Sequence, residues 1–181
     1  MSAIVTRPAA ADRERARAHT AVALYAGLWA LTALATAAAL VAPSLAPNRA
    51  PHPTLEPTAA AVASILLNNT RVLAPPFLLA AFGFGSARSS RALGDLIVAA
   101  PAALLTISVG IAIGCWGERL LPYIPQLPIE YAAAAAAASV WVAHRRGARP
   151  DVRSLARNAG VVLALLALAA ALEVLATPHA R

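Results

Sequence analysis

Residues 21–42 read AVALYAGLWALTALATAAALVA, an apolar run that contains no charged residue. A helix needs roughly 20 predominantly apolar residues to cross the hydrocarbon core of a bilayer. The whole chain has 181 residues, of which 60% are hydrophobic and 13% charged, and its mean hydropathy is +0.66. An average soluble domain is about half apolar and a quarter charged. The length of the run and the composition therefore both predict a membrane protein.

Four further apolar segments predict four further transmembrane helices. We expect transmembrane helices at about residues 20–41, 58–85, 96–115, 128–143 and 158–176. The predicted fold class is thus an all-α, polytopic membrane helix bundle of about five helices, spanning residues 20–177. Residues 1–19 form a polar N-terminal segment before this bundle, and residues 178–181 form a C-terminal tail. All 15 basic residues are arginine and alanine is abundant, a composition typical of GC-rich bacterial genomes, so we expect the bacterial plasma membrane.

The second apolar segment, residues 58–85, is longer than one straight crossing needs. Its middle is polar, and Pro75 and Pro76 follow, so we expect a kink or break there. One long tilted helix fits this pattern, and so does an interfacial helix followed by a short crossing, or a re-entrant element. A proline-rich linker at residues 44–57 precedes the segment and cannot form a regular helix.

Small residues indicate where the predicted helices approach one another. Gly110 and Gly114 have the small-xxx-small spacing that permits close contact between two membrane helices. The fourth segment contains seven consecutive alanines, residues 132–138. Alanine is a strong helix former but gains little from facing lipid. We therefore expect this helix inside the bundle.

The arginines predict the orientation in the membrane. Lys and Arg are enriched in cytoplasmic loops, which is the positive-inside rule. With the N-terminus in the cytoplasm and five crossings, the C-terminus lies outside, and eleven arginines fall in inner segments against three in outer ones. The net charge of +7 is thereby explained as a topology signal, and we expect no nucleic-acid partner. The basic turn at residues 144–157 has the charge to dock an acidic partner or anionic lipid, although orientation alone explains it as well.

Polar residues inside apolar segments are the candidate functional residues of a membrane protein. The predicted intramembrane cluster consists of Asn68, Asn69, Arg71 and Glu130, with Glu173 as a further candidate. Because a charge at bilayer depth costs about 2.5–3.5 kcal/mol, we hypothesise that Arg71 pairs with Glu130 or Glu173. The alternative places both glutamates at headgroup level in contact with water, and we favour it for Glu173. The two asparagines either bond between helices or satisfy backbone groups freed by the prolines.

The sequence contains no signature of a catalytic or cofactor site. It lacks an HExxH motif, a P-loop and a dinucleotide-binding fingerprint, and it has no lysine for a Ser–Lys dyad. Histidine occurs only outside the segment centres, and the single cysteine, Cys115, excludes a disulfide within the chain or a cysteine cluster. We therefore expect no catalytic residue, no metal, no cofactor and no enzymatic activity.

Two stretches together resemble the stage II sporulation protein M family of bacterial membrane proteins. The first is LNNTRV at residues 67–72, followed by Phe77, Gly83 and Gly85. It is similar to a paired-asparagine motif that leads into a helix with a downstream phenylalanine and glycines. The second, LPYIPQLPIE at residues 121–130, looks like the family's Leu-Pro-His-Gly-x-x-Glu element, which opens a helix rich in small residues. This chain departs from that element, because Tyr123 and Ile124 stand where the family has the histidine and glycine.

The resemblance implies a non-enzymatic membrane subunit or scaffold that works within a multiprotein complex. Cell-wall remodelling enzymes are the partners that the family suggests, together with membrane lipids and further membrane subunits, and a homo-oligomer fits as well. The rival function is transport: interrupted helices line substrate paths in transporters. A permease-like subunit of this size would need a dimer or an ATP-binding-cassette ATPase as its partner.

Overall fold

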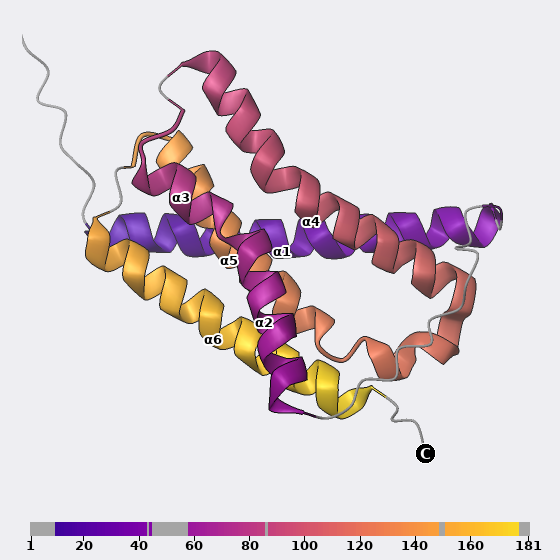
Figure 1. The fold of residues 1–181 in the computed structure, drawn as a ribbon. Helices are drawn as coiled ribbons and strands as arrows, with labels where there is room; N and C mark the ends of the chain where they lie inside the picture. The colour runs from indigo at the N-terminus through magenta and orange to yellow at the C-terminus, as the bar shows by residue number, and fades with distance from the viewer. Residues whose placement is uncertain (1–9, 43, 45–57, 86, 149–150, 178–181) are drawn as a thin grey trace, which may run out of the picture.

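The computed structural model describes residues 10–42, 44, 58–85, 87–148 and 151–177. These residues form helices and no strand, which confirms the all-α prediction for this part of the chain (Figure 1). The elements are α1 (Ala10–Val41), α2 (Ala59–Leu73), α3 (Pro75–Ala81), α4 (Arg88–Trp116), the 3-10 helix η2 (Gly117–Tyr123), α5 (Leu127–Arg145) and α6 (Val152–Ala176).

Three stretches of helix are long and apolar enough to cross a membrane, namely Glu14–Val41, Arg88–Tyr123 and Val152–Ala176. The pair α2 and α3 passes the same test together, which makes up to four spans. These two helices meet at an angle of 44° where Pro75 begins α3, so the predicted proline kink is confirmed. The alanine-rich α5 is not among these spans. Its crossing, and hence the number five, stays a prediction.

Three helices begin earlier than the apolar blocks predict. α1 begins at Ala10 instead of residue 20, α4 at Arg88 instead of residue 96, and α6 at Val152 instead of residue 158. Local capping explains the early start of α6, because the Asp151 carboxylate accepts a hydrogen bond from the backbone N–H of Ser154 at 2.7 Å. The predicted linker at 45–57, the tail at 178–181 and residues 1–9 lie outside the described residues.

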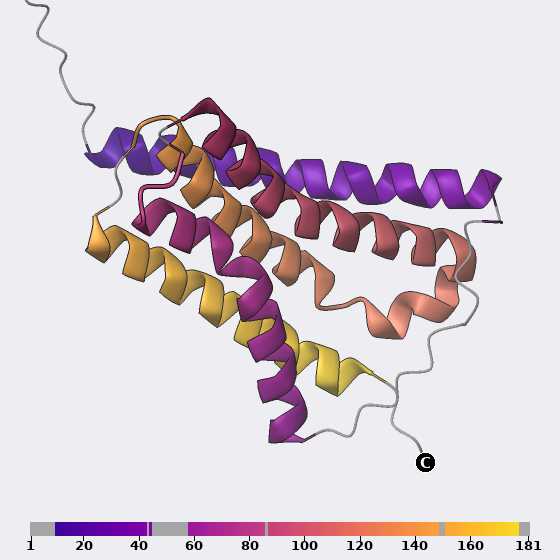
Figure 2. The same cartoon turned by 45° about the horizontal axis from the view of Figure 1, so that its top comes forward.

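α5 is the central helix of the bundle. It packs against α1 on one side and α6 on the other, and it also contacts α3 and α4 (Figures 1 and 2). Alanines supply much of its buried surface, and Ala133 and Ala137 pack directly against Val162 and Leu166 of α6. Because alanine side chains are short, neighbouring helices can approach α5 on several faces. The prediction of an interior alanine-rich helix is confirmed.

The predicted glycine contact lies between α4 and α1. A Cβ atom added to Gly110 would lie 2.5 Å from the carbonyl oxygen of Thr32, and one added to Gly114 would lie 2.7 Å from the Cβ of Ala39. The hydroxyl of Thr36 donates a hydrogen bond to the carbonyl of Gly110 across the same contact, at 3.0 Å. These separations leave no room for a side chain, so the small-xxx-small prediction is confirmed.

A second glycine contact joins α4 to the end of α5. The indole ring of Trp141 lies over Gly94, where an added Cβ would be 2.4 Å from the ring. The indole N–H donates a hydrogen bond to the carboxylate of Asp95 at 3.0 Å. Trp141 is only 2% exposed. The structure thus places Gly94 and Asp95 within a packed helix, although both follow a polar stretch of sequence.

Replacing Gly110 by alanine should lower the free energy of unfolding by about 1–3 kcal/mol, because the new methyl group overpacks the α1–α4 contact. Gly27→Ala is the matched control. Gly27 lies in α1 with no atom within 4 Å of the added Cβ, so this variant should not lose stability. The midpoint of unfolding by sodium dodecyl sulfate in mixed micelles measures the stability of both variants. Equal midpoints for the two variants would contradict the close α1–α4 contact.

Candidate functional site

A cavity of about 640 Å³ opens between α2 and the pair formed by α4 and η2, with α5 and α6 as its floor. Most of its wall is apolar. Its polar lining comes from a small set of side chains: Ser64, Asn68, Asn69, Ser108, Trp116, Tyr123, Gln126, Glu130 and Glu173. Three of the four residues of the predicted cluster thus share one cavity, and Glu173 joins them.

The central contact of the cavity joins Asn69 of α2 to Glu130 of α5. The side-chain amide of Asn69 donates a hydrogen bond to the carboxylate of Glu130 at 3.1 Å. Glu130 lies in the first turn of α5, one turn after Gln126, whose carbonyl accepts the Glu130 backbone N–H. A carboxylate is favoured there because unpaired N–H groups give the helix start a partial positive charge. Pro128 in the same turn removes an N–H that has no intrahelical partner in any case.

Gln126 is a polar residue of the cavity that the sequence analysis did not single out as a site. Its side chain is 6% exposed, and its amide nitrogen donates to the backbone carbonyl of Tyr123 at 2.9 Å. Its amide oxygen is buried and accepts no hydrogen bond from any described residue. A buried acceptor without a donor is unfavourable by about 1–3 kcal/mol. Because this oxygen is enclosed by protein, a donor in the cavity reaches it only if the Gln126 side chain moves.

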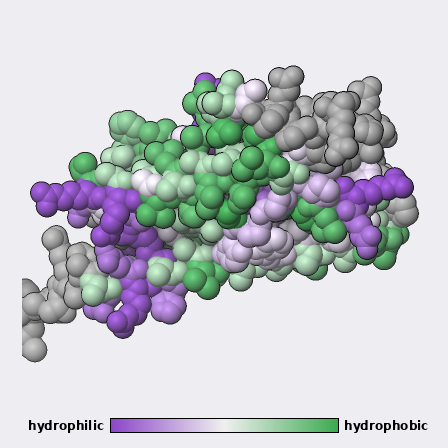
Figure 3. All heavy atoms as spheres, turned by 90° about the horizontal axis from the view of Figure 1, so that it is seen from below, coloured by the Kyte–Doolittle hydropathy of each residue, from purple (hydrophilic) through white to green (hydrophobic). Residues whose placement is uncertain are grey.

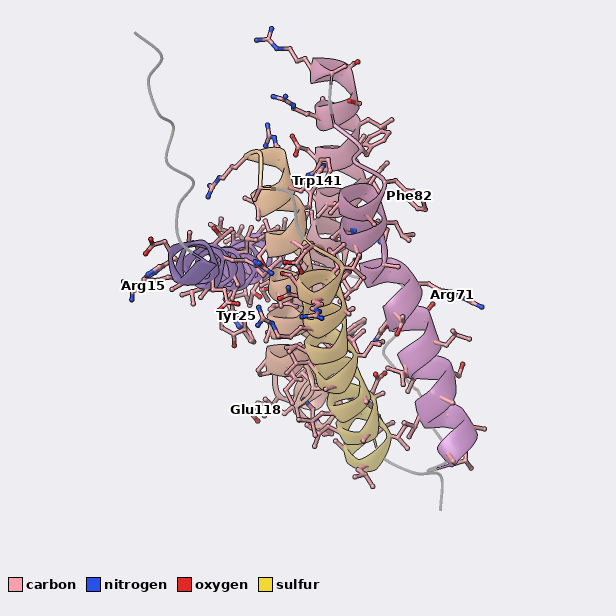
Figure 4. The ribbon with its side chains drawn as sticks, turned by 90° about the vertical axis from the view of Figure 1, so that its left-hand side faces the viewer. Arg15, Tyr25, Arg71, Phe82, Glu118 and Trp141 are labelled. Carbon is pink, nitrogen blue, oxygen red and sulfur yellow. The ribbon has the colours of Figure 1, made fainter. Side chains whose placement is uncertain are left out.

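The hypothesis that Arg71 pairs with Glu130 or Glu173 is wrong. Arg71 is exposed and points away from the other helices (Figure 4), and it forms no ion pair with either glutamate. Helix geometry explains this: Arg71 follows Asn69 by two residues, which is about 200° around an α-helix. When Asn69 faces α5, Arg71 must face outward. Asn68 lines the cavity but is exposed, and no hydrogen bond joins its side chain to another described residue.

Glu173 is half-buried in α6 and lines the same cavity as Glu130. None of the residues that line this cavity is basic. Two carboxylates and two serine hydroxyls thus belong to residues that line a space without a described counter-charge. The cavity therefore suits groups that donate hydrogen bonds or carry positive charge, because these satisfy buried acceptors.

The cavity unites the two stretches that resemble the stage II sporulation protein M family. Asn69 belongs to the first stretch and Glu130 to the second, and their hydrogen bond spans 61 positions of the sequence. No protein-family model, no curated protein and no solved structure matches this chain. The family resemblance therefore stays a prediction.

The variant Asn69→Leu should lower the free energy of unfolding by about 1 kcal/mol, since it removes the interhelical hydrogen bond and leaves the Glu130 carboxylate without its donor. The neighbouring variant Asn68→Leu is the matched control. It makes the same chemical change at an exposed position without such a bond, so its unfolding midpoint should stay close to that of the unmodified protein. A larger loss in Asn68→Leu than in Asn69→Leu would contradict the assignment of the contact to Asn69.

Proposed function

We propose that this chain is a non-enzymatic integral membrane subunit or scaffold of a multiprotein complex, similar to the stage II sporulation protein M family. The cavity between α2 and α4 is the observation that carries the proposal. It gathers carboxylate and amide acceptors inside a bundle that is otherwise apolar. Ionisable groups at membrane depth are rare and mark functional surfaces. A partner protein that donates hydrogen bonds to these acceptors would satisfy them.

The proposed topology has five crossings, with the N-terminus in the cytoplasm of a bacterial cell. Contacts within the molecule support it, because the segments proposed to be cytoplasmic meet at one end of the bundle. Glu14 at the start of α1 pairs with Arg157 of α6, and Arg17 donates to the hydroxyl of Ser154 at 3.2 Å. Hydrophilic residues gather toward the two ends of the molecule, and hydrophobic ones cover the middle (Figure 3).

The partner is proposed to insert a membrane helix between α2 and α4. α2 leans away from the bundle at its N-terminal end, as the two ribbon views show (Figures 1 and 2). Its contacts with α5 are few, and it packs chiefly against α6. A helix that carries serine, threonine, asparagine or basic side chains would satisfy Gln126, Glu130 and Glu173, and such hydrogen bonds stabilise helix pairs in membranes. By the family resemblance, cell-wall remodelling enzymes are the proposed partners.

Transport is the second candidate function. The observation that favours it is the bend between α2 and α3 beside a cavity with two carboxylates. Interrupted helices and intramembrane carboxylates line ion paths in secondary transporters. A volume of about 640 Å³ is within the range of small-molecule sites. In this case the chain would act as a permease-like subunit beside an ATP-binding-cassette ATPase.

Site-specific photo-crosslinking in native membranes tests the proposal. A benzophenone amino acid replaces Ser64 or Ser108, which line the cavity from α2 and α4. The matched control position is Leu34 of α1, which is 68% exposed and lies outside the cavity. We expect Ser64 and Ser108 to crosslink to the same partner protein, identified by mass spectrometry, and Leu34 to give no such product.

The identity of that product separates the two functions. A cell-wall remodelling enzyme or another non-transport membrane protein supports the scaffold, and a second copy of this chain assigns the cavity to a homo-oligomer. An ATP-binding-cassette subunit would favour transport instead. If Ser64, Ser108 and Leu34 gave the same products, the cavity would not be the binding surface and the proposal would be wrong.

A further inference from the structure

A second cavity, of about 410 Å³, lies between the start of α4 and the end of α5, apart from the site described above. Four arginines and one carboxylate dominate its lining: Arg88, Arg91, Arg145, Arg146 and Asp95. The sequence separates the two arginine pairs by more than fifty positions, and the fold brings them together. The excess of guanidinium groups makes the cavity strongly positive.

The carboxylate of Asp95 is already engaged by the protein. One of its oxygens accepts the hydrogen bond from the indole N–H of Trp141, at 3.0 Å, and the other pairs with the guanidinium of Arg145 at 3.1 Å. Trp141 is itself fixed by its packing over Gly94. Asp95 therefore orients Arg145, while it offsets only part of the positive charge of the cavity.

The remaining arginines keep donors free for a ligand. The Nε of Arg91 donates a hydrogen bond to the carbonyl of Gly85 at 2.7 Å, which holds the side chain in place. The two terminal nitrogens of Arg91 keep their donors for a ligand. Arg146 makes one long contact, 3.4 Å to the hydroxyl of Thr20. Arg88 makes no hydrogen bond or ion pair with the part of the chain that the structure describes. Guanidinium groups that line one exposed cavity can donate to the oxygens of a phosphate, which suits their forked geometry.

The surface beside the cavity is apolar. Leu96 of α4 is 63% exposed, and it follows the cavity residue Ala92 by one helical turn. A ligand with a phosphate and hydrocarbon chains could place its charge among the arginines and its chains along α4. A soluble phosphate compound would leave this apolar surface unused.

We propose that the cavity binds the phosphate of an anionic phospholipid, such as phosphatidylglycerol, in the leaflet that faces the arginine-rich end of the bundle. Arg88, Arg91 and Arg146 contact the phosphate, and Asp95 positions Arg145 for the same purpose. The acyl chains extend along α4 at Leu96. This binding is independent of the proposed partner site, which lies between α2 and the opposite half of α4.

Native mass spectrometry of the full chain in a neutral detergent tests the proposal, with phosphatidylglycerol and phosphatidylcholine as probes. The variant Arg88→Gln/Arg146→Gln removes two cavity arginines that make few internal contacts. The matched control Arg15→Gln/Arg153→Gln removes the same charge from exposed positions outside the cavity. The cavity variant should bind phosphatidylglycerol roughly 30-fold more weakly, since each basic residue near the membrane surface contributes about fivefold. The control variant should stay near the unmodified protein.

Three results would overturn the proposal. An equal loss in both variants would assign the binding to overall charge, and equal binding of phosphatidylcholine would remove the role of the anionic headgroup. If inorganic phosphate displaced phosphatidylglycerol at the concentration at which the lipid binds, the cavity would be a site for a soluble phosphate. The cavity variant must elute unchanged on gel filtration and keep its unfolding midpoint. These two controls show that its loss of lipid does not come from misfolding.

Discussion

Close packing around the alanine-rich helix α5 is the constraint on which the rest of the structure depends. Lipid tails are as apolar as leucine, so membrane helices associate through shape, hydrogen bonds and small residues. The short side chains of α5 let α1 and α6 approach on its two sides, and the larger residues at its two ends fix the register. Near the start, Tyr131 bonds to the hydroxyl of Thr32 in α1 at 2.8 Å, and near the end Trp141 covers Gly94 of α4.

The same constraint shapes both cavities. Because α5 packs against α1 and α6, its contacts with α2 and α4 are sparse, and a space remains between those two helices. Glu130 at the start of α5 points a carboxylate to that space and holds α2 through Asn69. At the other end of α5, Arg145 and Arg146 face the start of α4. One helix thus carries a carboxylate at one end and a pair of arginines at the other.

The sequence predicted the parts of the fold that depend on local chemistry. The proline kink, the buried alanine run and the Gly110 contact all follow from residue type and spacing, and the structure contains each of them. Three helices begin six to ten residues before the predicted membrane segments, because apolar length marks the membrane and not the helix caps. In the candidate site, Asn69 and Glu130 both belong to the predicted cluster, and the structure joins them by a hydrogen bond that the sequence did not specify. The predicted pairing of Arg71 was wrong. Predicting it requires knowing which face of α2 is turned toward the bundle, and this depends on tertiary packing.

The central claim is that the space between α2 and α4 is a binding site for a partner helix. The most direct measurement is a cryo-electron microscopy structure of the complex purified from native membranes through this chain. Our account predicts a partner helix between α2 and α4, with polar side chains within hydrogen-bonding distance of Gln126 and Glu130. A complex in which α2 closes onto α4, or in which lipid fills the space and the partner binds elsewhere, would contradict it.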